Sequence, residues 1–486
     1  MSRQVDGFQG LWRLAAMGLV MELCFVGMAY LGDLRQQTVP FLGQYALAFL
    51  CYGLAVLWSL RHPERRRVLF LIWGLALAFR ATLLFTSPAL SDDVWRYVWD
   101  GRLANAGVSP YALPVDSPLL DAYDSPLRVL VNNNWMASPY LPVAQVLFFA
   151  VYRLVPDSAL AFQLVAVLLD LLTGLLVMDL LRRLEIPGTR VLIYLWNPLV
   201  VVEFAHGAHV VDALMIFLMM AALWPLIALS SGTRRAAGTR SRLLSVLALA
   251  GATLTKVLPA LLLPVVGPRW GWRYLLLYAG LVLAVAAAFA LGPGWGLMGS
   301  LNGTGLFGAI RIYATYWNYN GGLYHWLEVL LSGYPTPGAV PLEVVGPGPI
   351  RAAKLTSLGI LGLALIAVWH KSRRCEDDLA FLRLTALPLA AYLLLATTVH
   401  PWYLSLVVPL FPFLTPRRLE ESKISRFLLP GIYATAVVAL SYLTYLDPAN
   451  PREYDAVRLV EYVPLYLMLI WAAWPAIGVA GGSGRG

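Results

Sequence analysis

Charged residues are scarce in this chain. Only 13% of its 486 residues are Asp, Glu, Lys or Arg, whereas 59% are hydrophobic. A soluble protein carries about 25% charged residues, so this composition excludes a soluble globular fold. Apolar stretches long enough to cross ~30 Å of hydrocarbon recur from end to end of the chain. The sequence therefore predicts an all-α polytopic protein of the lipid bilayer.

Cysteines and nucleotide-binding motifs are scarce too. The three cysteines offer no disulfide framework, because Cys24 and Cys51 lie in apolar segments and Cys375 lies in a basic loop. No phosphate loop occurs, and no Gly-rich dinucleotide fingerprint follows a strand. The sequence therefore argues against an ATP-driven pump and against an enzyme that uses cytoplasmic nucleotide sugars. Any chemistry would use material that is delivered through the lipid.

Basic residues concentrate in short loops between apolar segments. These loops are 61–67, 182–190, 231–242, 370–374 and 415–426. An excess of Lys and Arg in short loops marks the cytoplasmic side of a membrane. The net charge of +9 therefore indicates topology, with a cytoplasmic N-terminus, and no nucleic-acid partner is expected.

The apolar segments give a span-by-span prediction. We place membrane spans near 11–31, 41–60, 67–87, 159–182, 190–205, 210–230, 273–295, 351–370, 380–398, 402–415, 426–446 and 459–479. The stretch 241–270 starts and ends beside basic residues, so it either crosses twice or forms a re-entrant pair broken near Lys256 and Pro259. The segment 139–155 is expected to be a helix packed at the outer face. The result is about 12 to 14 transmembrane helices in a single domain, 1–486, because no linker, charge run or repeat divides the chain.

Two long loops remain on the outer face, at 88–158 and 297–350, and loops of this length are usually functional. The first begins with "SDDVWRYVWDGR". A helix-capping acid and an ion pair between Asp92 and Arg96 would explain this motif without any chemistry. However, a carboxylate is favoured in its ionised form at a helix N-terminus. At the mouth of a membrane span, Asp92 or Asp93 would suit a general base for a hydroxyl group.

Histidines and cations near the outer face are the other candidates. Four histidines fall at or near this face in the predicted topology, namely His206, His209, His325 and His400. His209 and Asp212 are spaced either for a metal-ligand pair, which is a weak signal from two residues, or for a hydrogen-bonded couple. A phosphate leaving group needs positive charge, and the cations considered are Arg96, Arg102, Arg128, Lys256 and Arg311. An ammonium group between apolar runs is costly, so Lys256 is either partnered or reaches the interface.

The block "SDDVWRYVWDGRLANAGVSPY" resembles the first-loop signature of integral-membrane glycosyltransferases of the GT-C superfamily. The resemblance is to the bacterial polyprenyl-phosphate-mannose-dependent α-mannosyltransferases in particular. Further similar blocks follow in order, "WNPLVVVEFAHGAHVVDAL" (196–214), "TKVLPALLLP" (255–264), "WNYNGGLYH" (317–325) and "HPWYL" (400–404). The resemblance spans about 90 to 404.

This resemblance implies a GT-C-like bundle in a bacterial inner membrane with its active site facing the exterior. Such enzymes transfer one sugar, by family default mannose, from a polyprenyl-phosphate carrier to a hydroxyl of an acceptor glycan or glycolipid, with inversion. The base of this reaction falls on Asp92 or Asp93. The resemblance and the residue types together nominate donor- and acceptor-binding residues, namely Arg96, Tyr97, Arg102, His206, His209, Lys256, Arg311, Asn320 and His400. A divalent cation is the one cofactor considered.

Two other functions compete with this interpretation. A glycan ligase or polymerase with a lipid-diphosphate donor would depend on Arg and His in a large outer loop, without a first-loop carboxylate as base. A transporter or flippase of lipid-linked sugars predicts internal repeats and a polar site at the bilayer midplane. No repeat is evident, and the polar signals collect at one face.

Overall fold

The computed structural model describes residues 2–62, 64–227, 238–291, 304–332, 348–415, 426–447 and 450–480. These residues form α-helices and short 3-10 or π-helical segments, and no strand occurs among them. Nine of the described helices are long and apolar enough to cross a membrane. The prediction of an all-α polytopic membrane protein is confirmed.

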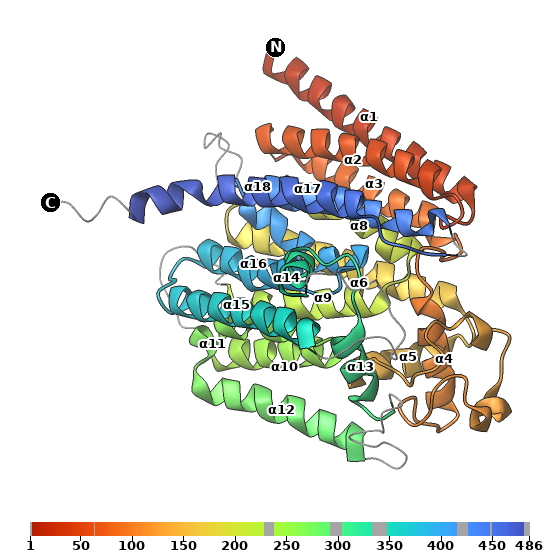
Figure 1. Cartoon of the computed structure of the whole chain (residues 1–486). Helices are drawn as coiled ribbons and strands as arrows, with labels where there is room; N and C mark the ends of the chain where they lie inside the picture. The colour runs from red at the N-terminus through yellow and green to blue at the C-terminus, as the bar shows by residue number, and fades with distance from the viewer. Residues whose placement is uncertain are drawn as a thin grey trace.

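The nine long helices match nine of the predicted spans. They are α1 (Ser2–Leu31), α2 (Thr38–Arg61), α3 (Arg66–Leu84), α6 (Ala159–Arg183), α12 (Trp272–Leu291), α15 (Gly348–Arg373), α16 (Asp378–Leu395), α17 (Leu428–Val437) with its 3-10 continuation η9 (Val438–Leu446), and α18 (Asp455–Ala480). They lie roughly alongside one another in Figure 1. Inside the bundle the buried Arg80 of α3 pairs with Asp170 of α6 at 2.5 Å, so each charge is partnered, as membrane burial requires.

Two predicted spans are broken rather than continuous. The first, 190–205, forms η3 (Gly188–Val191), α7 (Leu192–Leu195), α8 (Pro198–Val201) and the π-helix η4 (Val202–His206). The chain breaks where Asn197 accepts a hydrogen bond from the Leu199 amide and Pro198 contributes no donor. The second, 402–415, forms the 3-10 helices η7 (Pro401–Leu406) and η8 (Val408–Leu414). Irregular backbone is tolerated at membrane depth when protein surrounds it, and both stretches are almost wholly buried.

Other segments also differ in length from a full crossing. The span predicted at 210–230 is the shorter helix α9 (Val210–Leu223) with the 3-10 turn η5 (Trp224–Leu226). The break predicted near Lys256 and Pro259 is present, because α10 (Thr239–Thr255) ends at an extended Lys256 and is followed by η6 (Leu258–Leu262) and α11 (Leu263–Trp270). The described part of the chain thus has nine full-length spans, fewer than the 12 to 14 expected, and the remaining apolar sequence forms these shorter pieces.

The loop 88–158, which the sequence predicts to be the first outer loop, forms a compact layer at one end of the bundle. Its elements are α4 (Asp93–Asn105), η1 (Pro118–Tyr123), η2 (Arg128–Leu130) and α5 (Pro142–Leu154). The helix expected over 139–155 is therefore confirmed as α5. Helices α4 and α5 lie with α13 (Gly308–Tyr316), from the second outer loop, on the right of Figure 1. The other described helix of that second loop is α14 (Leu323–Ser332). Much of the rest of the loop lies outside the described residues, and so do most of the basic loops 231–242 and 415–426.

The basic loops that are described lie at the other end. Helix α2 starts beside Arg35, close to α4, and runs away to the loop 61–67, from which α3 returns. Helix α6 likewise starts beside the outer-loop layer and ends at Arg182 and Arg183. The bundle therefore has one basic end and, opposite it, one end that carries the acidic motif.

Candidate active site

A cavity of about 940 Å³ opens at the end of the bundle that carries the acidic motif. Its walls come from the start of α4, the loop 132–141, the break after α10, helix α13, the segment 400–403 and the first turns of α18. Six of the eleven predicted site residues line it, namely Asp92, Asp93, Arg96, Tyr97, Lys256 and His400. The structure thus brings together residues that are up to three hundred positions apart in the chain.

The two adjacent carboxylates have different partners. Asp92 Oδ1 accepts a hydrogen bond from Arg35 Nη2 at 2.9 Å, and the Arg35 guanidinium lies 4.7 Å from the centre of the Tyr445 ring. Asp93 Oδ1 accepts a hydrogen bond from the Asn132 amide at 2.9 Å. Within the described part of the chain, Asp93 Oδ2 has no hydrogen-bond partner. Arg35 therefore neutralises the charge of Asp92, whereas Asp93 keeps one oxygen available to a substrate.

The expected ion pair between Asp92 and Arg96 does not form. Arg96 is buried and donates hydrogen bonds to the carbonyl oxygens of Asn132, Asn133 and Met136, at 3.0, 2.8 and 3.1 Å. Burial lowers the pKa of Arg96. Because its donors are used on the backbone of the loop that carries Asn132, Arg96 positions this loop rather than offering its charge to a ligand.

Helix α4 is held in place by aromatic stacking and hydrogen bonds to α5 and to the loop that precedes α5. The Tyr97 ring stacks on Phe148 of α5 at 4.9 Å and meets Tyr140 edge-on at 5.2 Å. One turn further, buried Asp100 accepts hydrogen bonds from Ser138 and, at 2.8 Å, from Gln145. Burial raises the pKa of Asp100 to about 6. The helix ends at Asn105 and is followed by Gly107 in the left-handed region at φ 76°.

Lys256 supplies the cation on the facing wall. Its Nζ lies 2.8 Å from Asp212 Oδ1 and 4.1 Å from the centre of the Tyr403 ring. The Asp212 side chain is only 4% exposed, whereas that of Lys256 is 24% exposed towards the cavity. The carboxylate and the ring both stabilise an ammonium group at membrane depth. Asp212 is therefore paired with Lys256 and not, as the spacing suggested, with His209.

An aromatic stack lies beside Lys256. The His400 ring is parallel to Trp402 at 4.4 Å and stacks on Tyr319 at 4.7 Å, while His209 stacks on Trp402 at 4.1 Å. Burial, and to a lesser degree the Lys256 charge, lowers the pKa of His400 to about 3. His400 is therefore neutral at ordinary pH and offers the cavity a hydrogen-bonding ring, so the charge on this wall comes from Lys256.

The other five predicted residues lie outside the cavity. His209 is buried behind Trp402, with Nε2 3.3 Å from Glu203 Oε2. His206 is buried beneath the acidic motif, where Nδ1 lies 2.7 Å from Thr86 Oγ1 and Nε2 accepts the Ala89 N–H at 3.3 Å. Arg102 pairs with Asp157 at 3.0 Å and holds the outer loop together. Arg311 is exposed on α13.

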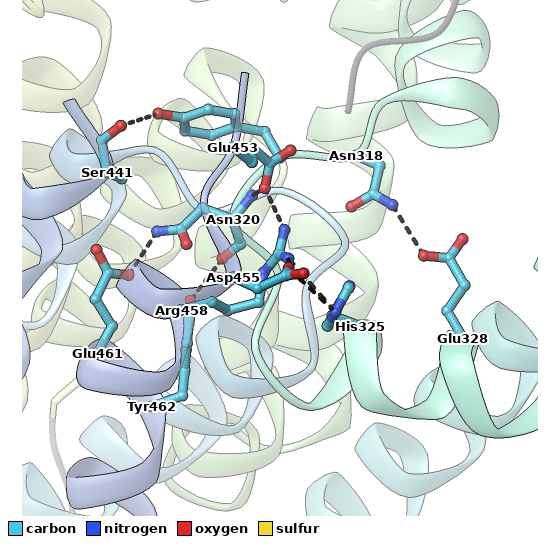
Figure 2. A network of polar contacts seen from close by, with 11 residues as sticks. Asn318, Asn320, His325, Glu328, Ser441, Glu453, Asp455, Arg458, Glu461 and Tyr462 are labelled. Atoms are coloured by element: carbon cyan, nitrogen blue, oxygen red, sulfur yellow. Dashed lines mark hydrogen bonds and ion pairs between the residues drawn. The ribbon is translucent and has the colours of Figure 1, made fainter. Parts of the chain in front are cut away.

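Asn320 also lies outside the cavity, at the junction shown in Figure 2. Its backbone N–H donates to Glu453 Oε2 at 2.8 Å, and its side-chain amide donates to Glu461 Oε2 at 2.7 Å. Its carbonyl oxygen accepts a hydrogen bond from the Tyr462 hydroxyl at 2.7 Å. Asn320 thus joins the segment after α13 to α18.

Beside this junction, the first turn of α18 provides a charged wall. Arg458 contacts Glu453 and lies 3.0 Å from Asp455 Oδ1 and 3.4 Å from His325 Nε2 (Figure 2). All four residues line the cavity. Sequence analysis named only His325 of this wall, and it missed Arg35. The signal was available, because the predicted topology places both polar turns, 32–37 and 447–458, on the outer face.

The described residues do not fit a resident divalent cation. They contain no group of three or more His, Cys, Asp or Glu side chains that could hold a metal ion. Asp92 is paired with Arg35, and Asp212 with Lys256.

Comparisons with known proteins point to one class of enzyme. Residues 15–272 match the family model described as "Alpha-(1->6)-mannopyranosyltransferase, N-terminal domain". The chain is 28% identical over 394 residues to Alpha-(1->6)-mannopyranosyltransferase A of Mycobacterium tuberculosis (strain ATCC 25618 / H37Rv), an alignment that covers 75% of this chain and 68% of the relative. No solved structure matches. The family match includes both carboxylates and Lys256, whereas His400 and the α18 wall lie beyond it.

Proposed function

Because the chain belongs to the alpha-(1->6)-mannopyranosyltransferase family, we propose that it transfers mannose from a polyprenyl-phosphate carrier to a hydroxyl group of an acceptor glycan or glycolipid. The transfer inverts the anomeric carbon. The protein is an integral protein of a bacterial inner membrane, and its cavity faces the exterior. The position of the basic loops, at the end of the bundle opposite the cavity, supports this orientation.

One observation carries the proposal, namely that Asp93 and Lys256 line the same cavity from different elements. Transfer with inversion in a single displacement needs a base beside the acceptor hydroxyl. It also needs a positive charge beside the leaving phosphate, where negative charge develops. Asp93 is placed at the start of α4 with one free oxygen. Lys256 lies at the break after α10 and is partly exposed to the cavity.

In the proposed reaction, Asp93 Oδ2 accepts the proton of the acceptor hydroxyl as its oxygen bonds to the anomeric carbon. The bond from that carbon to the phosphate oxygen breaks, and the carrier phosphate leaves with the electron pair. Lys256 stabilises the phosphate, and neutral His400 is suited to donate a hydrogen bond to it. Arg35 holds Asp92 in place beside the base. Arg96 holds Asn132, which in turn orients Asp93.

The test measures transfer of radiolabelled mannose from polyprenyl-phosphate-mannose in membranes that contain the full chain. A general base contributes about 10²- to 10⁴-fold, so Asp93→Asn should lower kcat by this order. Asp92→Asn should have a smaller effect, because the Asp92 charge is already paired. Asp157→Asn is the matched control, since it breaks the ion pair with Arg102 outside the cavity and should leave transfer close to wild type.

Three results would contradict the proposal in different ways. Full transfer by Asp93→Asn would mean that Asp93 is not the base. Transfer only from a lipid-diphosphate donor, with no loss in either carboxylate variant, would favour the ligase or polymerase. If no donor is used while labelled lipid-linked sugar crosses vesicles that contain the protein, the transporter would be favoured.

A further inference from the structure

A second large cavity, about 1390 Å³, lies between α16, α17 and α18. We call it the α16–α18 groove. Small residues form part of its lining. They are Ala386, Ala390 and Ala391 on α16, Gly431 and Ala434 on α17, and Ala473 on α18. The groove exceeds the ~300–1,000 Å³ typical of small-molecule sites, and the rest of its wall is mostly apolar, as with Leu387 and Leu469.

The basic side chains that line the groove lie at one of its two ends. At the basic end of the bundle it is lined by His370, Lys371 and Arg374. Lys371 and Arg374 are exposed, and within the described parts of the chain neither forms an ion pair. Arg383 also lines this end, but it donates to the carbonyl oxygens of Phe413 and Thr415.

At the other end the groove reaches Glu461 and Tyr462, and no Lys or Arg lines it there among the described residues. Glu461 is 3% exposed. One of its oxygens accepts the Asn320 amide, and the other has no hydrogen-bond partner within the described chain. A phosphate would therefore be disfavoured at this end. In the proposed reaction, the polyprenyl-phosphate donor presents its phosphate at this same end of the bundle. Because the groove has no Lys or Arg there among the described residues, the phosphate of the donor does not suit the groove.

We propose that the α16–α18 groove binds an anionic glycerophospholipid from the leaflet at the basic end of the bundle. The phosphate lies against Lys371 and Arg374, and the acyl chains run between α16, α17 and α18. Basic pockets between transmembrane helices are suited to anionic headgroups, and the small residues of the walls leave room for the chains. This site is separate from the transfer cavity and does not depend on the proposed reaction.

The binding test uses the purified, delipidated full chain in detergent and native mass spectrometry. It is titrated with phosphatidylglycerol and, in parallel, with phosphatidylethanolamine of the same acyl chains. We expect one phosphatidylglycerol per chain, bound more tightly than phosphatidylethanolamine. Each basic side chain near a headgroup changes affinity about fivefold, so K371Q/R374Q should raise the Kd for phosphatidylglycerol roughly 30-fold.

Two further variants make the test specific. R65Q/R67Q removes two exposed arginines from the start of α3, at the same end of the bundle, and should leave the Kd unchanged. A390L/A434L fills the groove without changing its charge and should reduce binding of both lipids. Size-exclusion profiles show whether each variant is folded.

The proposal is overturned by any of three results. One is equal affinity for the two lipids together with no effect of K371Q/R374Q. Another is unchanged binding by a folded A390L/A434L variant. The third is displacement of phosphatidylglycerol by polyprenyl-phosphate in direct competition, which would make the carrier the occupant.

Discussion

The ammonium group of Lys256 has two roles in the structure, which substitutions can separate. It neutralises the buried Asp212, and in the proposed reaction it stabilises the leaving phosphate. We predict that Lys256→Met abolishes transfer and also lowers the free energy of unfolding by roughly 3 kcal/mol, because Asp212 loses its partner. Lys256→Met/Asp212→Asn should regain most of that stability without regaining transfer. Thermal unfolding and the mannose transfer assay measure the two effects, and transfer by the double variant would refute the phosphate-binding role.

Asp100 makes the outer layer sensitive to pH. Burial raises its pKa from 3.8 to about 6. A carboxyl whose pKa is raised on folding stabilises the fold fully below its unfolded pKa, and this contribution is lost as pH rises through the folded value. We predict that the melting temperature of the wild type falls between pH 4 and about 6.5 more steeply than that of Asp100→Asn. Differential scanning fluorimetry across this range measures the melting temperatures of both proteins. If the two melting temperatures change in parallel with pH, Asp100 is not held in a protonated form by burial.

Six of the eleven residues that the sequence nominated line one cavity, whereas the partner predicted for Asp92 was wrong. Asp93 and Lys256 were nominated because the predicted topology places both near the outer face, and both line the cavity. The pairing of Asp92 with Arg96 was wrong because helix spacing considers only neighbours along one helix. Arg35 lies 57 residues away in the chain, and a partner at this separation is fixed only by how α1 and α2 pack against the rest of the bundle.

At the scale of elements, the contact between α4 and α5 sets the position of the acidic motif. A Cβ added at Gly101 would lie 2.6 Å from the carbonyl oxygen of Phe148 and 2.8 Å from Tyr152 Cβ. Overpacking of this kind costs about 1–3 kcal/mol. We therefore predict that Gly101→Ala lowers the melting temperature and reduces transfer by moving α4.

The matched control for this prediction is Gly53→Ala on α2. An added Cβ there meets nothing within 4 Å, so the change should be neutral or slightly stabilising. Thermal unfolding and transfer measured on both variants check the pair. Equal melting temperatures for Gly101→Ala and Gly53→Ala would mean that α4 and α5 are packed less closely than the structure shows.

The elements that the sequence misassigned share one property. The segments 190–205 and 402–415 are apolar throughout and so resemble spans, yet they are broken helices surrounded by protein. Hydropathy reports only that a segment avoids water, and it does not distinguish lipid from protein as the neighbour. Their short length and their prolines, such as Pro198, Pro409 and Pro412, were the available signals.

At the scale of the whole molecule, the proposed orientation can be tested by labelling. Val129, in the loop 88–158, is 85% exposed, and Arg67 is exposed in the first turn of α3, at the basic end. In a variant with the three cysteines replaced by serine, Val129→Cys should react with a membrane-impermeant maleimide on intact cells. Arg67→Cys should react only after permeabilisation. The reverse pattern would place the cavity in the cytoplasm and contradict the proposed lipid-carried donor.

The wall formed by the start of α18 has a consequence for synthesis of the protein. Asp93 emerges from the ribosome 360 residues before Glu453. Until α18 is inserted, Asn320 lacks its partners Glu461 and Tyr462, and the cavity lacks one side. A nascent chain that stops before α18 therefore holds Asp93 and Lys256 but no complete cavity.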